Sequence, residues 1–135
     1  GDSFPVDAEY SSIDHIDPSN FAATERVEAT SNTGLTYNIA VARDSKGYFL
    51  SYNGWGNLDL RSFDPSTGNI NSGVVAGLNG EDLRGLVMGP DGRLWVGRAR
   101  TSDPGLMLID PGNDSELDFV GTDLLPKSIT FTNIQ

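Results

Sequence analysis

The sequence predicts an all-β protein built from repeated units of about 45 residues. Of its 135 residues, 16 are Gly and 7 are Pro, and 37% are hydrophobic. Many turn-forming residues between short apolar segments are typical of all-β folds. The 3.6-residue periodicity that helical repeats require is absent. Two landmarks recur along the chain with the same period, and they order the expected elements.

The first landmark is an apolar residue followed by Asp-Pro. It occurs at Ile16-Asp17-Pro18, Phe63-Asp64-Pro65 and Ile109-Asp110-Pro111, with successive aspartates about 46 residues apart. The second landmark matches DSKGYFLSY at 44–52 with PDGRLWVG at 90–97, so that Gly47 corresponds to Gly92, about 45 residues later. A period of this length, with four short strands per unit, predicts the blades of a β-propeller.

Each expected strand is an apolar segment bounded by turn residues such as DSKG and DPSTGN. The most complete unit predicts strands at 37–43, 48–52, 58–63 and 70–77. The next unit predicts strands at 83–89, 93–99, 106–109 and 116–121. The whole chain, 1–135, is then one propeller segment: a partial first blade at about 5–35, a second at about 36–80, a third at about 81–124, and a strand of the next blade at about 125–135, within KSITFTN.

Two stretches resemble known propeller repeats. GPDGRLWVG followed by GLMLIDPGN resembles the sensor-propeller repeats of bacterial two-component regulators, and IDPSNFAATERVEAT resembles the YVTN, or surface-layer, repeats. The resemblance covers about residues 13–131 and implies a β-propeller fold. Because such blades occur in lyases, lactonases, sensors and scaffolds alike, it implies no single function.

The number of units predicts a need for partners. Propellers have 4 to 8 blades, whereas this chain holds about three. We expect either a piece of a longer propeller or one half of a six-bladed ring, in which two copies join head to tail. Both alternatives predict contacts through strand edges with other blades or with a second copy, because an unpaired edge is a template for association.

Candidate ligand-binding residues lie on the expected irregular rim, because binding residues concentrate on variable loops held by a rigid scaffold. An exposed Trp beside Arg and Asn is suited to stack on a sugar ring or to bind a carboxylate. The alternative is that Trp55 packs between blades and the arginines form surface ion pairs. Trp95 is expected to fill the space between blades. The candidates are Tyr37, Asn38, Asn53, Trp55, Arg84, Arg98, Arg100 and Lys127.

Charge and residue usage disfavour several classes of function. The formal net charge of −10 disfavours nucleic acid and anionic lipid as main partners. Without cysteine the chain offers neither a thiol nucleophile nor a zinc-thiolate site, and no apolar run is long enough for a membrane helix. The single histidine, His15, is expected to be a solvated surface residue. No cofactor is expected, with calcium at the Asp-rich turns as an alternative.

These observations favour a non-catalytic binding module that is extracellular or periplasmic. One alternative is a carbohydrate-binding lectin assembled from several short chains, with Trp55 stacking on the sugar. A second is a metal-dependent hydrolase of the lactonase type, which the resemblance to propellers implies. Arg84 and Lys127 oppose this second alternative, because they place cations where a metal-binding propeller needs carboxylates.

Overall fold

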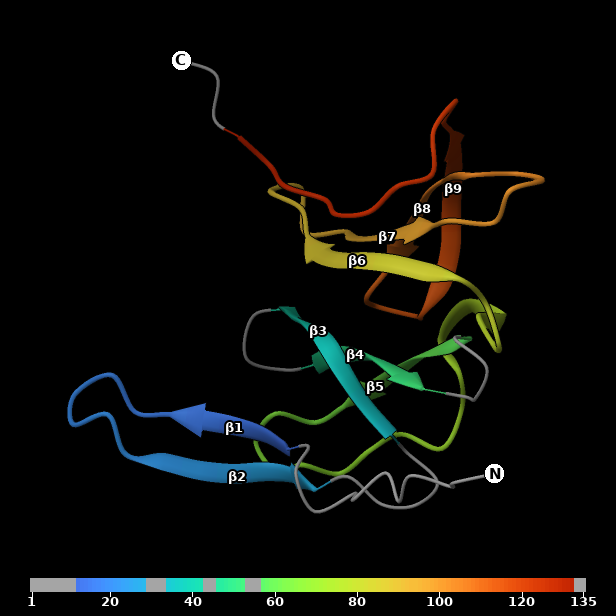
Figure 1. The fold of residues 1–135 in the computed structure, drawn as a ribbon. Coiled ribbons are helices and arrows are strands. Elements are labelled where there is room, and N and C mark those ends of the chain that lie inside the picture. Colours follow the sequence, from blue (N-terminus) through green and yellow to red (C-terminus); the bar gives the residue numbers. More distant parts are fainter. Residues whose placement is uncertain (1–11, 29–33, 43–45, 53–56, 133–135) are drawn as a thin grey trace, which may run out of the picture.

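The structure is a computed structural model that describes residues 12–28, 34–42, 46–52 and 57–132. It is all-β, with three antiparallel sheets that follow one another in chain order (Figure 1). Sheet 1 contains β1 (Ser12–Ile16) and β2 (Ala23–Glu28). Sheet 2 contains β3 (Gly34–Ala42), β4 (Lys46–Tyr52) and β5 (Leu58–Phe63). Sheet 3 contains β6 (Leu83–Met88), β7 (Leu94–Arg98), β8 (Gly105–Asp110) and β9 (Ser115–Gly121).

The all-β prediction is confirmed, and every strand of sheets 2 and 3 lies within a few residues of its expected position. Four strands were expected in each complete unit, but sheet 2 has three. The expected strand at 70–77 is wrong: Ile70 forms one bridge with Phe63, and a 3₁₀ turn follows at Val75–Gly77. Positive φ angles at Ala76 and Gly77 break the extended conformation there.

The expected strand at 127–133 is also absent over its described part, residues 127–132. This C-terminal segment, residues 125–132, runs over the side of sheet 3 that is turned away from sheet 2 (Figure 1). A strand forms only where a neighbouring strand supplies partners for its backbone N–H and C=O groups. Among the described residues, no strand pairs with this segment.

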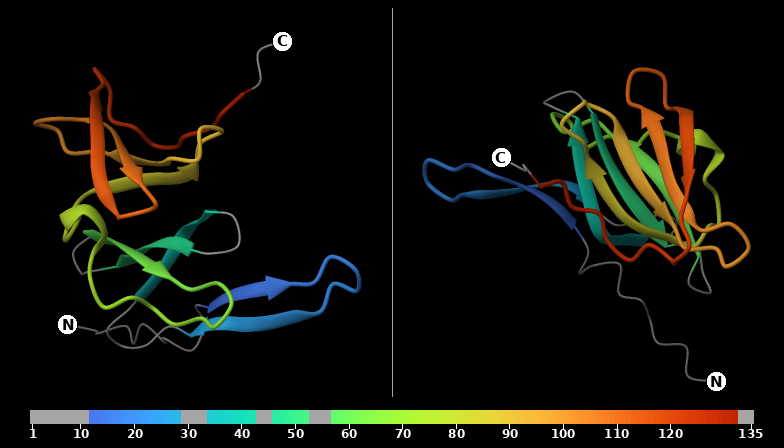
Figure 2. Two further views of the ribbon diagram at one scale, coloured as in Figure 1. Left: turned by 180° about the vertical axis from the view of Figure 1, so that it is seen from behind. Right: turned by 90° about the horizontal axis from the view of Figure 1, so that it is seen from above.

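Sheets 2 and 3 stack face to face and bury the main core between them (Figure 2). Sheet 2 contributes Tyr48 and Leu50, which are fully buried. Sheet 3 contributes every second residue of β7 and β8, beginning with Leu94 and Met107. The first strands of the two sheets, β3 and β6, lie side by side. The core residues are Ala40, Tyr48, Leu50, Leu60, Val75, Leu78, Leu83, Leu86, Leu94, Val96, Met107 and Ile109.

A smaller core joins sheets 1 and 2. Ile13 of β1 packs against Phe49 and Phe63, whose rings meet edge to face with their centroids 6.0 Å apart. Because side chains alternate along a strand, Phe49 faces sheet 1 while its neighbours Tyr48 and Leu50 face sheet 3. β4 is therefore covered on both faces, which explains its nearly continuous apolar sequence.

The three Asp-Pro sequences form the same turn, and this is the clearest structural repeat in the chain. In each turn the N–H four residues after the aspartate donates to the aspartate carbonyl oxygen, at 2.7 Å for Phe21, 2.7 Å for Gly68 and 2.8 Å for Asp114. All three donors have positive φ, from 57° to 78°. We call these the first, second and third Asp-Pro turns, at residues 17–22, 64–69 and 110–115.

The aspartate side chain closes each Asp-Pro turn. Oδ1 of Asp17, Asp64 and Asp110 accepts a backbone N–H two residues on, at 2.7 to 2.8 Å. This local bond is the reason that Asp is favoured at the start of a turn. In the first and second turns, a serine hydroxyl donates to the same oxygen. The acidic residues at these positions are thus accounted for by turn structure.

Candidate functional site

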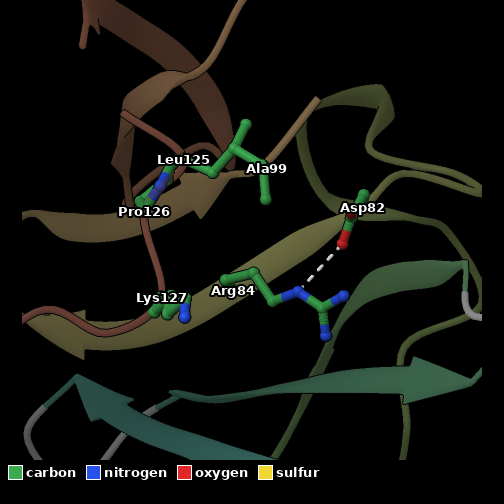
Figure 3. A pocket seen from close by; sticks show the side chains of 6 residues that line it. All are labelled: Asp82, Arg84, Ala99, Leu125, Pro126 and Lys127. Atoms are coloured by element: carbon green, nitrogen blue, oxygen red, sulfur yellow. Dashed lines mark ion pairs between the residues drawn. The ribbon is translucent and has the colours of Figure 1, made fainter. Parts of the chain in front are cut away.

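One pocket lies at the end of sheet 3 where β6 begins and β7 ends (Figure 3). It is open to solvent and has a volume of about 430 Å³. One wall comes from sheet 3 and the other from the C-terminal segment, so residues far apart in the sequence meet here. The pocket is lined by Asp82, Arg84, Ala99, Leu125, Pro126 and Lys127.

Two glycines allow the C-terminal segment to form this wall. At Gly85 the β6 ladder shifts register and φ is +77°; a Cβ there would lie 3.2 Å from the backbone of Ser128 and Ile129. At Gly97 a Cβ would lie 2.1 Å from the carbonyl oxygen of Arg84 and 3.2 Å from Pro126. Because glycine leaves room for such close approach, these two positions let the C-terminal segment pack against β6 and β7.

The pocket holds more positive than negative charge. Arg84 Nε lies 3.0 Å from Asp82 Oδ1, a contact with the geometry of an ion pair, while this buried oxygen accepts no hydrogen bond from the described residues. The Arg84 side chain remains half exposed. Lys127 is exposed and forms no ion pair with any described residue. Two cations and one carboxylate suit a ligand that bears a negative group.

Arg98 and Arg100 lie at the same end of sheet 3 but are bound by acidic neighbours. Arg98 Nη2 donates to Asp103 Oδ2 at 2.7 Å, and the guanidinium carbon lies 4.3 Å from the centre of the Phe119 ring. Arg100 donates to the carboxylate of Glu81. These contacts occupy both guanidinium groups, and neither arginine lines the pocket.

The remaining expected site residues fall elsewhere. Tyr37 and Asn38 belong to β3, and Asn53 and Trp55 lie outside the described residues. The structure thus brings Arg84 and Lys127 together. It also adds Asp82, which was not expected from the sequence although its spacing to Arg84 matches one face of a strand. Trp95 lies in β7 as expected. Its ring meets that of Phe131 edge to face, with the two ring centroids 5.6 Å apart.

A second polar cluster joins sheets 2 and 3, and sequence reasoning missed it. Tyr48 Oη donates to Asp114 Oδ1 at 2.7 Å, and Lys46 Nζ lies 3.1 Å from both oxygens of that carboxylate. Lys46 also donates to the carbonyl oxygen of Pro111 at 3.0 Å. The start of β4 thereby holds the third Asp-Pro turn. No signal in the sequence links these groups, because they are more than 60 residues apart.

The described part of the chain shows neither a metal-ligand cluster nor a membrane-spanning helix. There, no three His, Cys, Asp or Glu side chains gather as metal ligands would. His15 is exposed on β1, close to Asp17. None of the helical turns described has the length and apolar character needed to cross a bilayer.

The chain was also compared with known proteins. No model of a known protein family matches it, and no curated protein sequence matches it either. The functional proposals therefore rest on the residues and contacts of this chain.

Proposed function

We propose that this chain is a non-catalytic binding module of the β-propeller type, completed by a further sheet and acting outside the cytoplasm. The recurrence of one Asp-Pro turn in all three sheets supports a repeat of the blade kind. The stacking of the sheets in chain order, with β3 beside β6, supports a radial arrangement. The lack of cysteine and the acidic composition suit an exported module.

The observation that carries the proposal is a difference between equivalent faces of two sheets. The face of sheet 2 that meets sheet 3 is buried at Ala40, Tyr48, Leu50 and Leu60. The corresponding face of sheet 3, which we call the far face, is turned away from sheet 2. The side chains on this face are those of Trp95 in β7, Leu106 and Leu108 in β8, and Val120 in β9. Trp95 and the two leucines alternate along their strands with core residues, and Val120 pairs with Leu106.

The far face is only partly covered. The C-terminal segment crosses this side of the sheet, and Leu108 is buried. Val120 is nevertheless 46% exposed, and Trp95 and Leu106 are partly exposed. An apolar surface of this kind marks an interaction site. Because the same face of sheet 2 is buried by a whole sheet, a further sheet is the partner that fits.

The test is the solution mass of the chain, measured by light scattering over a range of concentrations. We expect association toward twice the chain mass of 14.5 kDa. Val120→Glu should abolish this association and leave the circular dichroism unchanged, because it adds charge to the far face alone. Tyr52→Glu, which changes a similarly exposed side chain on sheet 2, is the control. A chain that stays monomeric, or a Val120→Glu variant that associates normally, would contradict the proposal.

The pocket supports a ligand site in the same module. We assign binding of a small carboxylate-bearing ligand to Arg84 and Lys127, because an exposed ammonium beside a half-exposed guanidinium supplies hydrogen-bond donors and charge together. Nuclear magnetic resonance titration with a panel of mono- and dicarboxylates tests it. Lys127→Gln should remove the response, whereas Arg100→Gln, at the same end of sheet 3 but outside the pocket, should not. A panel without any response from pocket residues would refute the assignment.

A further inference from the structure

The start of β7 repeats the arrangement at the start of β4. In the ladders, Gly47 pairs with Phe63 and Leu94 pairs with Ile109. Phe63 and Ile109 are equivalent, because each directly precedes an Asp-Pro sequence. Their pairing partners, Gly47 and Leu94, are therefore equivalent as well. Arg93 and Trp95 therefore occupy in sheet 3 the positions of Lys46 and Tyr48 in sheet 2.

The Lys46–Tyr48 pair shows what these two positions do when a sheet follows. Both side chains bond the third Asp-Pro turn: Lys46 reaches the carbonyl oxygen of Pro111 at 3.0 Å, and both donate to the Asp114 carboxylate. Asp114 is the residue of that turn with positive φ. A basic residue and an aromatic donor, two positions apart, thus hold the turn of the following sheet.

The Arg93–Trp95 pair has the same character, but its donors lack such acceptors among the described residues. Trp95 Nε1 is buried and donates no hydrogen bond to them. Arg93 is half exposed, and its one described ion pair is a 3.7 Å contact with Asp91 in its own turn. A buried N–H without a partner costs free energy, but this one is enclosed by the chain's own atoms beside Gly89 and Asp91. The half-exposed guanidinium of Arg93 is therefore the donor that a second copy can reach.

The first Asp-Pro turn offers this pair a backbone carbonyl and an aromatic ring in place of the Asp114 carboxylate. Phe21 holds the position of Asp114, with φ 57° against 58°, and its side chain is 82% exposed. The Pro18 carbonyl corresponds to that of Pro111, the acceptor used by Lys46. Compared with Lys46 and Tyr48, a guanidinium and an indole present larger flat surfaces, which suit an aromatic ring.

We propose that the first Asp-Pro turn of a second copy of this chain docks on the Arg93–Trp95 pair, with Phe21 against both side chains and the Pro18 carbonyl as the acceptor of Arg93. This contact rests on the proposed function, because it names the sheet that packs on the far face. The arrangement is head to tail: sheet 1 of one copy follows sheet 3 of the other, as sheet 3 follows sheet 2 within the chain.

The experiment compares Phe21→Ala with Leu124→Ala. Leu124 is 81% exposed, nearly the same as Phe21, but it follows β9 and so lies at the opposite end of sheet 3 from Arg93. We expect Phe21→Ala to weaken self-association, measured by light scattering, by about tenfold or more, and Leu124→Ala to leave it unchanged. Phe21 is on the surface, so its replacement should leave the monomer folded.

Tryptophan emission reports the contact directly. In a Trp55→Phe background, Trp95 is the only tryptophan. Its emission should shift to shorter wavelength as the copies associate, and Phe21→Ala should remove the shift. Suppose that the chain associates without a shift in Trp95 emission and with the same strength in Phe21→Ala. In that case this docking mode is wrong, while the proposed function stands. If association is lost in Val120→Glu but persists in Phe21→Ala, a different turn occupies the face and the docking mode is again wrong. Without any association, both proposals fail.

Discussion

Tyr48 and Asp114 join two sheets through one short hydrogen bond. Tyr48 Oη lies 2.7 Å from Asp114 Oδ1, and the phenol is otherwise buried in the core between sheets 2 and 3. The backbone carbonyl of Asp114 in turn accepts the N–H of Ala76 at 3.1 Å. This aspartate therefore ties the start of β4, the 3₁₀ turn and the third Asp-Pro turn together.

Replacing Tyr48 by Phe should destabilise the protein. The variant keeps the ring in the core but leaves the partly buried Asp114 carboxylate with Lys46 as its remaining side-chain partner. A hydrogen bond to a charged group contributes about 2 kcal/mol, and urea unfolding should show a loss of that size. Tyr52→Phe is the control, because Tyr52 is half exposed at the end of β4. Equal stabilities of the two variants would show that the Tyr48–Asp114 bond contributes little.

Stability should fall at alkaline pH because of the same residue. Burial, and next the hydrogen bond to Asp114, raise the pKa of Tyr48 well above its ordinary value of 10.0. The unfolded chain therefore releases the phenol proton at a lower pH than the folded protein, and the contribution of Tyr48 is lost as pH rises past about 10. Unfolding by urea between pH 8 and 11 measures this. Tyr48→Phe should show a shallower decline than Tyr52→Phe, and parallel curves would contradict the assignment.

Stability should also fall in acid, through the Asp-Pro turns. Hydrogen bonds from the Ser19 hydroxyl and then the Ser19 N–H lower the pKa of Asp17, and those from Ser66 do the same for Asp64. A lowered pKa contributes stability above the ordinary value of 3.8, and this contribution is lost as pH falls below it. Thermal unfolding of a Ser19→Ala, Ser66→Ala variant between pH 6 and 2 should show a weaker acid dependence than the parent chain. An unchanged profile would argue against these bonds.

Gly47 should tolerate no side chain. It lies inside β4, and a Cβ would sit 2.2 Å from the Phe63 ring, which is buried between sheets 1 and 2. Overpacking of a core typically costs about 1 to 3 kcal/mol, so Gly47→Ala should lower the free energy of unfolding by that amount. Gly73→Ala is the matched control, because a Cβ at Gly73 would have no atom within 4 Å of it. A neutral Gly47→Ala would mean that Phe63 can move aside.

Gly47 also shows where sequence comparison reaches its limit. The sequences around Gly47 and Gly92 match, yet Gly92 is a turn residue with φ +77°, while Gly47 is inside a strand. The ladders align Gly47 with Leu94 instead. A sequence match aligns similar letters, whereas the structural equivalence is set by which strand residues pair.

Local physical chemistry explains what the sequence determined by itself. The strands of sheets 2 and 3 follow from alternating apolar residues, and the Asp-Pro turns follow from proline and from side-chain bonds that span two residues. These features depend on neighbours along the chain. The choice of Arg84 and Lys127 as site residues, made from the irregular rim of the expected blades, stays a prediction, although both line the pocket.

The tertiary structure decided the remaining features. The segment at 70–77 was expected to be a strand, but Val75 and Leu78 turn into the core between the sheets, and burial there outweighs a regular ladder. The bond of Tyr48 to Asp114, the pairing of Arg98 with Asp103 and the place of Asp82 in the pocket all depend on how separate segments pack. Distances between residues far apart in the chain are set by the stacking of the sheets, which no local pattern of residues encodes.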